Sequence, residues 1–304
     1  VEDPRIYAEL IRQWSTLHPE FTFLPRKFKF AVTASPRDRA ALRVHDVGVH
    51  LRRTKSGKVG FEVMVGGGQG RTPIIGHTIR RFLPKKHLLS YLEAILRVYN
   101  QLGRRDNLFK ARIKILVNSV GPKKFAALVE DEWGHIRGAE TLDVPREEFT
   151  RIKDYFAPPA YERLEPVHAS LVHARSRDTE FARWCDRNLG EHKQPGYGIV
   201  NISLKPIGEV PGDATAEQME AVADLAERYS FGEIRVTHEQ NLVLPDVRLG
   251  DVHAVWQGLG AADLATPNIG LISDIICCPG LDYCNLASAR SIPVAQRIAK
   301  RFGD

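Results

Sequence analysis

The sequence predicts an α+β fold with about two domains, and three observations support this prediction. First, the chain has 304 residues, and a domain commonly takes roughly 150. Second, 43% of the residues are hydrophobic, which is enough for a sizeable core and excludes bulk disorder. Third, segments with helical apolar spacing and segments with alternating apolar spacing occur along the same chain. A membrane-spanning protein is not expected, because no uncharged apolar run approaches the roughly 18 residues of a membrane helix.

Hydrophobic spacing and turn residues place the elements of the first half. Apolar residues three and four positions apart predict each helix, and Pro122 at a first turn is typical of a helix start. The sequence TKSG at 54–57 separates two alternating segments, which predicts a hairpin. In order, we expect a helix at 4–17, a strand at 27–32, hairpin strands at 47–52 and 60–65, a helix at 87–99, a strand at 112–117 and a helix at 122–133.

The second half begins after a polar, proline-bearing stretch, which we interpret as a linker or wrapping segment with one helix near 179–189. Thr215 with Gln218 three residues later is a capping box, which predicts a helix start. The expected order is a strand at 197–206, a helix at 215–229, strands at 233–237 and 241–244 and a helix at 249–259. This β-α-β-β-α order fits a ferredoxin-like half-domain.

The predicted boundaries divide the chain into residues 1–145, a linker at 146–195, the half-domain at 196–264 and a last segment at 265–304. The chain lacks an initiator methionine and stops just after a helical segment. We therefore expect both ends to be cuts in a longer chain.

Charge is distributed unevenly along the chain. Residues 1–124 carry 25 Lys and Arg against 9 Asp and Glu, whereas residues 125–304 carry 18 against 28. A half this basic favours an anionic partner, which could be nucleic acid, a membrane surface, a polyanionic cofactor or an anionic substrate. The alternative is that these charges serve surface solubility alone.

Two lysines are separated by one residue in the segment LPRKFKF, at 24–30. Side chains alternate across a strand, so Lys27 and Lys29 should share one face while Phe28 and Phe30 share the other. An anion between the two ammonium groups would relieve their mutual repulsion. The alternative is an edge strand whose lysines discourage aggregation.

The segment RIKI at 112–115 repeats this pattern, with Arg112 and Lys114 on one face of the predicted strand. A guanidinium can grip a carboxylate with two hydrogen bonds, whereas an ammonium is a mobile point charge. The glycine run at 66–70 matches neither a dinucleotide fingerprint nor a phosphate-binding loop. It allows close backbone approach to a ligand, or it forms a tight turn.

Three of the four cysteines, Cys277, Cys278 and Cys284, lie within eight residues. The chain has too few cysteines for a disulfide-rich secreted scaffold, so the cluster indicates metal or redox chemistry. Five residues separate Cys278 from Cys284, a spacing less typical of zinc than of iron–sulfur sites. A pair of buried free thiols is the alternative, and Cys185 is expected in the core.

Taken in order, these motifs resemble the sirohaem-dependent sulfite and nitrite reductase hemoproteins, in particular the beta-subunit type of assimilatory sulfite reductase. The resemblance runs from about Thr16 to the end of the chain. The motifs that carry it are LPRKFK at 24–29, VGGG at 65–68, RRDNLFKARIK at 104–114, THEQNLVL at 237–244 and CCPGLDYC at 277–284.

The resemblance implies a six-electron reduction of sulfite to sulfide at a sirohaem that shares a cysteine thiolate with a [4Fe–4S] cluster. Reduction of nitrite to ammonia by the same cofactors is the alternative. It also implies a mixed-sheet sirohaem- and anion-binding domain at 1–145, and the start of a truncated cluster-binding domain at 265–304. A strongly basic half suits sirohaem, which carries many carboxylates.

Position by position, the resemblance implies that Lys27 and Lys29 are the catalytic lysines that hold the anion and help supply protons. Arg26 lies beside them as a cofactor-binding residue. Arg112 and Lys114 match basic residues near the sirohaem carboxylates. Cation pairs of this kind lower the cost of binding a dianion.

The same comparison implies that Gln240 and Asn241 line the cofactor and that Cys278 and Cys284 are the first two cluster ligands. The family supplies two further cysteines downstream, beyond the last residue of this chain, and further substrate arginines in an N-terminal half. Cys277 has no assigned counterpart.

The implied partners are the anion and an electron donor, either a flavoprotein subunit or a ferredoxin, in the cytoplasm, with neither nucleic acid nor membrane. A basic nucleic-acid-binding module is the competing hypothesis, but Phe28 and Phe30 alternate away from the lysines, unlike the stacking aromatics of single-strand binders. A zinc-stabilised structural protein is a third hypothesis, which two suitably placed thiols support poorly.

Overall fold

Residues 1–139 and 142–303 are described by the computed structural model, in which the chain divides into two units, Val1–Ala157 and Pro158–Asp304. Each unit has its own hydrophobic core. The predicted division into four segments stays a prediction. In the described part of the chain, no helix is long and apolar enough to cross a membrane.

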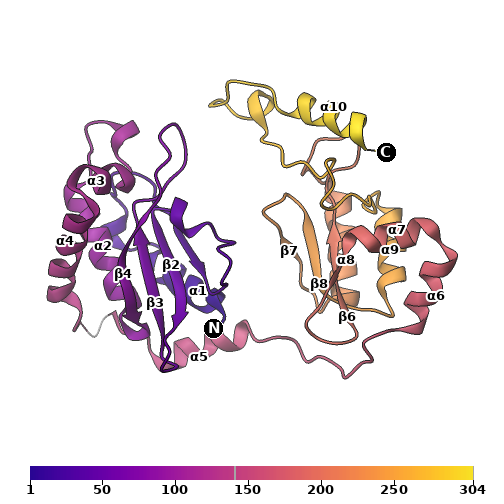
Figure 1. Ribbon diagram of the computed structural model, residues 1–304, viewed down its shortest axis with the longest axis horizontal. Helices are drawn as coiled ribbons and strands as arrows, with labels where there is room; N and C mark the ends of the chain where they lie inside the picture. The colour runs from indigo at the N-terminus through magenta and orange to yellow at the C-terminus, as the bar shows by residue number, and fades with distance from the viewer. Residues whose placement is uncertain (140–141, 304) are drawn as a thin grey trace. The chain divides into compact units, whose positions relative to one another are not determined.

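The first unit is built on a mixed four-stranded sheet in the order β1-β2-β3-β4 (Figure 1). β1 runs parallel to β2, and the remaining neighbours are antiparallel. The predicted hairpin is present as β2 and β3, with Gly57 at a positive φ of 83° in its turn. The strands are β1 (Phe30–Thr33), β2 (Val47–Arg53), β3 (Val59–Val65) and β4 (His77–Pro84), of which β4 was not expected from the sequence.

Helices cover this sheet and close its core. The apolar face of α2 packs against α4, and residues such as Leu92 and Ile95 are fully buried with the strand residues Val49 and Phe61. Asp3 caps α1 by accepting a hydrogen bond from the backbone of Arg5 at 2.9 Å. The helices are α1 (Pro4–Ser15), α2 (Leu88–Leu102), α3 (Ile113–Val120), α4 (Pro122–Ile136) and α5 (Arg146–Tyr155).

The strand predicted at 112–117 is wrong, because this segment forms α3. Its buried residues are Ile113, Lys114, Leu116 and Val117, which recur at the three- and four-residue spacing of a helix. Alternation held only over the first four residues, so Arg112 and Lys114 do not share a strand face. Arg112 instead lies at the N-cap of the helix, with a ψ of 148°.

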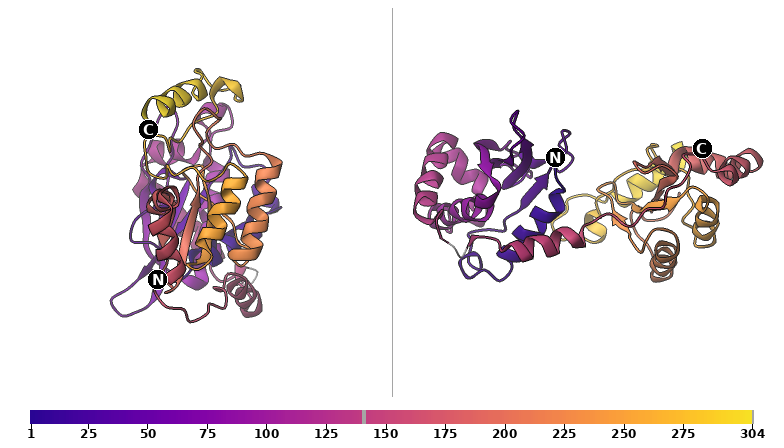
Figure 2. Two further views of the ribbon diagram at one scale, coloured as in Figure 1. Left: turned by 90° about the vertical axis from the view of Figure 1, so that its right-hand side faces the viewer. Right: turned by 90° about the horizontal axis from the view of Figure 1, so that it is seen from below.

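The second unit contains an antiparallel sheet in the order β5-β6-β8-β7. The predicted capping box is present at the start of α8, between Thr215 and Gln218. α8 and α9 pack against each other beside this sheet (Figure 2). The elements are α6 (Ala169–Arg177), α7 (Thr179–Asn188), β5 (Leu189–Glu191), β6 (Tyr197–Ile202), α8 (Ala216–Tyr229), β7 (Arg235–Val236), β8 (Leu242–Arg248), α9 (Val252–Ala261) and α10 (Ile292–Phe302).

Two outcomes follow for the second half of the sequence. The β-α-β-β-α order is confirmed as β6-α8-β7-β8-α9, and the predicted α+β class with a mixed sheet and a ferredoxin-like half-domain is confirmed with it. The expected linker contains more structure than predicted, because α5 and α6 precede the anticipated helix α7.

Candidate functional site

The lysine-bearing segment lies directly before β1. Lys27 and Lys29 are exposed, whereas Phe28 and Phe30 pack against the core of the first unit. The Phe28 ring lies 5.1 Å from that of Phe30 and 5.5 Å from that of Tyr99, between centroids. The predicted alternation therefore holds, although the strand starts only at Phe30 and both lysines precede it.

The backbone of Lys29 is held from both sides. Its N–H donates to Oδ2 of Asp46 at 3.0 Å, and its carbonyl accepts from the backbone of Val47 at 3.1 Å. Asp46 also accepts from Arg112, whose Nη2 lies 2.7 Å from Oδ1. The Asp46 side chain is 1% exposed, so burial raises the pKa of its carboxyl although the Arg112 guanidinium opposes this.

The side chain of Lys114 holds the glycine-rich loop, residues 66–72, by two hydrogen bonds to its backbone. Its buried ammonium donates to the carbonyls of Gln69 at 2.8 Å and Thr72 at 2.6 Å. Burial lowers the pKa of Lys114, and the nearby Arg112 charge lowers it further. Within the loop, a Cβ on Gly67 would lie 2.3 Å from the Arg43 carbonyl oxygen. A side chain at this position would clash with the backbone of Arg43, so close packing against the chain's own backbone is enough to explain the glycine.

The cysteine loop belongs to the second unit. Cys278 is exposed and Cys284 is half-buried, while Cys277 is buried and its pKa is raised by that burial. The turn between them is tight: the N–H of Cys284 donates to the carbonyl of Gly280 at 2.9 Å, and Gly280 has a positive φ of 59°. Within the described residues, no group of three or more His, Cys, Asp and Glu side chains is arranged to hold a metal ion.

The side chain of Gln240 binds this loop through two hydrogen bonds to the backbone of Cys277. Its side-chain oxygen accepts from the Cys277 N–H at 2.8 Å, and its side-chain nitrogen donates to the Cys277 carbonyl at 2.8 Å. The buried Asn241 donates to Asp274 at 2.9 Å, and the ammonium of the buried Lys205 lies 2.6 Å from the same oxygen. The cofactor contacts predicted for Gln240 and Asn241 stay predictions, and so do the roles assigned to the lysines, arginines and cysteines above.

One residue and one contact of this arrangement were missed by sequence reasoning. Asp46 was not singled out, although it is an isolated acid within a strongly basic stretch and directly precedes a predicted strand. The grip of Gln240 on Cys277 joins residues 37 positions apart and has no local signal in the sequence.

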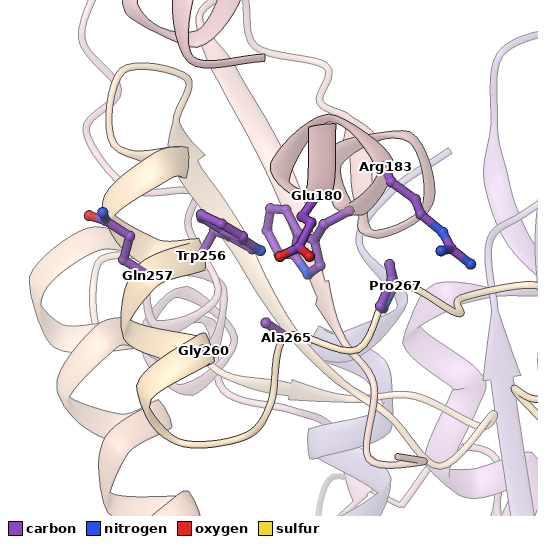
Figure 3. Close-up of a pocket in the computed structure, with 8 residues that line it drawn as sticks. Glu180, Arg183, Trp256, Gln257, Gly260, Ala265 and Pro267 are labelled. Carbon is purple, nitrogen blue, oxygen red and sulfur yellow. The ribbon is translucent and has the colours of Figure 1, made fainter. Parts of the chain in front are cut away.

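A separate cavity of about 530 Å³ lies between α7 and α9 of the second unit. It is lined by Trp184, Trp256 and Glu180 among others, and Figure 3 shows the Trp256 ring pointing toward the Glu180 carboxylate while Gln257 points away. None of the residues predicted as functional lines it.

Comparison with known families gives two matches in this chain. The family described as "Nitrite and sulphite reductase 4Fe-4S domain" matches residues 1–137. The family described as "Nitrite/Sulfite reductase ferredoxin-like half domain" matches residues 192–262.

Individual relatives carry both kinds of name. A chloroplastic ferredoxin–nitrite reductase of Arabidopsis thaliana is 24% identical over 312 residues, which cover 99% of this chain and 47% of the relative. A protein named sulfite reductase [ferredoxin] 1, of Mycolicibacterium paratuberculosis, is 27% identical over 311 residues, or 100% of this chain and 48% of the relative. This chain thus spans about half the length of the curated relatives it matches.

A solved structure, that of the NirA protein of Mycobacterium tuberculosis, has a similar fold. Its TM-score is 0.67 at 24% identity, over 97% of this chain and 46% of that one. At this identity the similarity supports the fold.

Proposed function

Because this chain belongs to the sulfite and nitrite reductase hemoprotein family, we propose that it is part of an enzyme that reduces sulfite to sulfide by six electrons. Members of this family bind sirohaem and a [4Fe–4S] cluster. When bound, these two groups supply the electron chemistry. The chain itself would bind and orient the anion and its cofactors.

The chemistry of the cysteine loop fits a cluster as part of its ligand set. Thiolates are the usual ligands of iron–sulfur clusters, and of the two cysteines Cys278 is exposed and Cys284 is half-buried. A [4Fe–4S] cluster takes four ligands, and among the described residues no group of three or more His, Cys, Asp and Glu side chains is arranged to hold a metal ion. We propose that Cys278 and Cys284 are two of the four.

The cations of the first unit differ in their availability to an anion. Arg26, Lys27 and Lys29 are exposed and close in sequence, whereas Lys114 is committed to two carbonyls of the glycine-rich loop. Arg112 is paired with Asp46, although its side chain remains 21% exposed. We therefore propose that Lys27 and Lys29 contact the anion, with Arg26 beside them, and that Arg112 and Lys114 form the wall of the cofactor pocket.

The lysine ammonium groups have two chemical tasks in this proposal. A unit charge about 4 Å from another gains about 4 kcal/mol at an effective dielectric of about 20, so two ammonium groups strongly favour a bound dianion. Cleavage of each bond between sulfur and oxygen also consumes protons, and a lysine Nζ can donate one to the departing oxygen. The core packing of Phe28 and Phe30 keeps both ammonium groups on the exposed side.

The exposed pair Lys27 and Lys29, on a backbone anchored at Asp46 and Val47, is the observation that carries this proposal. Relatives named ferredoxin–nitrite reductase support nitrite reduction to ammonia as the alternative reaction. The same names support a ferredoxin as the electron donor, with a flavoprotein subunit as the alternative. We propose a cytoplasmic enzyme.

The test is steady-state turnover of the cofactor-loaded enzyme with sulfite and, separately, nitrite, using a chemical electron donor. Lys27→Met and Lys29→Met should each lower kcat/KM about 10- to 100-fold, which corresponds to about 1.4 to 2.7 kcal/mol of lost transition-state stabilisation. The matched control is Lys55→Met, which removes an exposed lysine in the turn between β2 and β3. Unchanged kcat/KM in both test variants would refute the role of the lysines, and a higher kcat/KM for nitrite would favour the alternative substrate.

A further inference from the structure

Asp46 is a buried carboxylate that the proposed reaction does not use. It directly precedes β2 and is 0% exposed as a whole residue. Removing a carboxylate from water is strongly unfavourable unless it is paired and hydrogen-bonded.

The contacts of Asp46 connect three segments that are far apart in the sequence. Its Oδ2 accepts the N–H of Lys29, and its Oδ1 accepts from Nη2 of Arg112 at 2.7 Å and from Nε at 3.2 Å. Its backbone carbonyl accepts the N–H of Gly66 at 3.0 Å, at the start of the glycine-rich loop. One residue therefore ties the lysine segment, the glycine-rich loop and the start of α3 to each other.

The bond to Lys29 has a geometric consequence. The segment before β1 makes few regular sheet bonds, because the β1–β2 pairing starts at Phe30 and Val47. Asp46 and Val47 fix the two peptide groups of Lys29, and the position of a Cβ follows from the peptides on either side of it. Loss of the Asp46 bond would leave the direction of the Lys29 side chain less restricted.

We propose that Asp46 is the positioning residue of the anion site: its carboxylate holds the Lys29 backbone and the Arg112 guanidinium so that the Lys29 ammonium points to the bound anion. This inference rests on the proposed function of Lys29. Asp46 itself is buried and does not contact the anion.

The experiment uses the cofactor-loaded enzyme with Asp46→Ala, Asp46→Asn, Lys29→Met and the double variant Asp46→Ala/Lys29→Met. Asp46→Ala should raise the KM for the anion about 10-fold. Asp46→Asn should bring KM part of the way back, to within about threefold of the wild type, because its amide oxygen can still accept the Lys29 N–H whereas its NH2 group cannot accept from Arg112. In the Lys29→Met background, Asp46→Ala should lower kcat/KM by a smaller factor than in the wild-type background, because the part of its effect that acts through Lys29 is already missing and only the part through Arg112 remains.

Backbone amide hydrogen exchange gives a second measurement that does not depend on turnover. The Lys29 amide should exchange at least about 10-fold faster in Asp46→Ala and at nearly the wild-type rate in Asp46→Asn. The matched control is Asp38→Asn, which alters another carboxylate that accepts a backbone N–H, that of Leu42 at 3.0 Å. This control should leave both KM and the Lys29 amide unchanged.

The outcomes separate the inference from the function on which it rests. Absence of sulfite and nitrite turnover in the wild-type enzyme refutes the proposed function. An unchanged kcat/KM in Lys29→Met refutes the proposed role of Lys29, and this inference with it. A normal KM in Asp46→Ala, while Lys29→Met is impaired, overturns the inference alone. If Asp46 had only a structural role, Asp46→Ala would lower the fraction of active enzyme, so the apparent kcat would fall while KM stayed constant. The losses of kcat/KM caused by Asp46→Ala and by Lys29→Met would then multiply in the double variant. That result also overturns the inference. If Asp46→Ala does not fold, Asp46→Asn provides the test. A 10-fold rise in the KM of Asp46→Asn, while its Lys29 amide stays protected from exchange, would show that the bond to Lys29 is intact but does not position the lysine, and this result overturns the inference.

Discussion

Replacement of Gln240 by leucine should loosen the cysteine loop while leaving the rest of the second unit folded. Leucine has a similar volume but can make neither of the two hydrogen bonds, each 2.8 Å long, that Gln240 forms with the backbone of Cys277. Gln240 also has a positive φ of 61°, a conformation that costs a non-glycine residue of the order of 1 kcal/mol. Glycine would avoid this strain but would also lack both hydrogen bonds.

The magnitude follows from the two bonds. A typical hydrogen bond contributes about 1 kcal/mol net, so losing both should destabilise the closed loop by about 2 kcal/mol. This corresponds to a roughly 30-fold larger population of the open loop. The Cys277 side chain, with the whole residue 6% exposed, should then become reactive to the same extent.

Two measurements follow the opening of the loop. Amide hydrogen exchange reports the protection of the Cys277 N–H, and labelling with a thiol reagent followed by mass spectrometry reports its sulfur. The exposed Cys278 is an internal reference, because its labelling rate should change little. Gln257→Leu, at an exposed glutamine of α9, is the matched control.

The refuting result is defined by the same numbers. If protection of the Cys277 amide in Gln240→Leu stays within about threefold of the wild type, the two bonds together contribute less than about 0.7 kcal/mol. Gln240 would then not hold the loop. Gln240→Gly distinguishes the two contributions, since it removes the bonds and also relieves the backbone strain.

Two further predictions concern the first unit. Lys114→Met should lower the free energy of unfolding by about 2 to 3 kcal/mol, because two carbonyls of the glycine-rich loop lose a charged donor. Denaturant titration measures this change. The control Lys110→Met, at an exposed position, should change the free energy of unfolding by less than about 0.5 kcal/mol in the same titration. Burial opposes ionisation of Glu62, but the hydrogen bonds from Arg52 and Thr78 together outweigh burial and lower the pKa of Glu62. The ionised carboxylate therefore stabilises the fold fully at a pH above its unfolded-state pKa. This stabilisation is lost as the pH falls through the folded-state pKa. The deficit of Glu62→Gln relative to the wild type, measured by thermal unfolding between about pH 7 and pH 2, should therefore shrink in acid, and a constant deficit would contradict this assignment.

Local sequence signals were sufficient for much of the fold. The turn sequence at 54–57 correctly predicted the hairpin of β2 and β3, and the pair Thr215 and Gln218 correctly predicted the start of α8. These features depend on residues close together in the chain, whose preferences act without help from the rest of the fold. The alternation of Lys27 and Lys29 with phenylalanines that pack against the core was predicted for the same reason.

The error at 112–117 had a signal that was available in the sequence. Ile113, Leu116, Val117 and Val120 follow the three- and four-residue spacing of a helix, but the first four residues alone also alternate like a strand. A short β-branched segment satisfies both periods, and packing of α3 against α4 and β3 decides between them. β4 was missed because its consecutive residues Arg80 and Arg81 obscure the alternation.

The sequence by itself determined the fold class, part of the order of the elements and the residues that carry the family resemblance, because these properties depend on local preferences and on motif spacing. Only the tertiary structure decided how those residues are held. Asp46 meets Lys29 and Arg112 across 17 and 66 positions, and Gln240 meets Cys277 across 37. Such contacts form because burial forces polar groups to find partners wherever the fold brings them, and no periodicity along the chain encodes which partner that is.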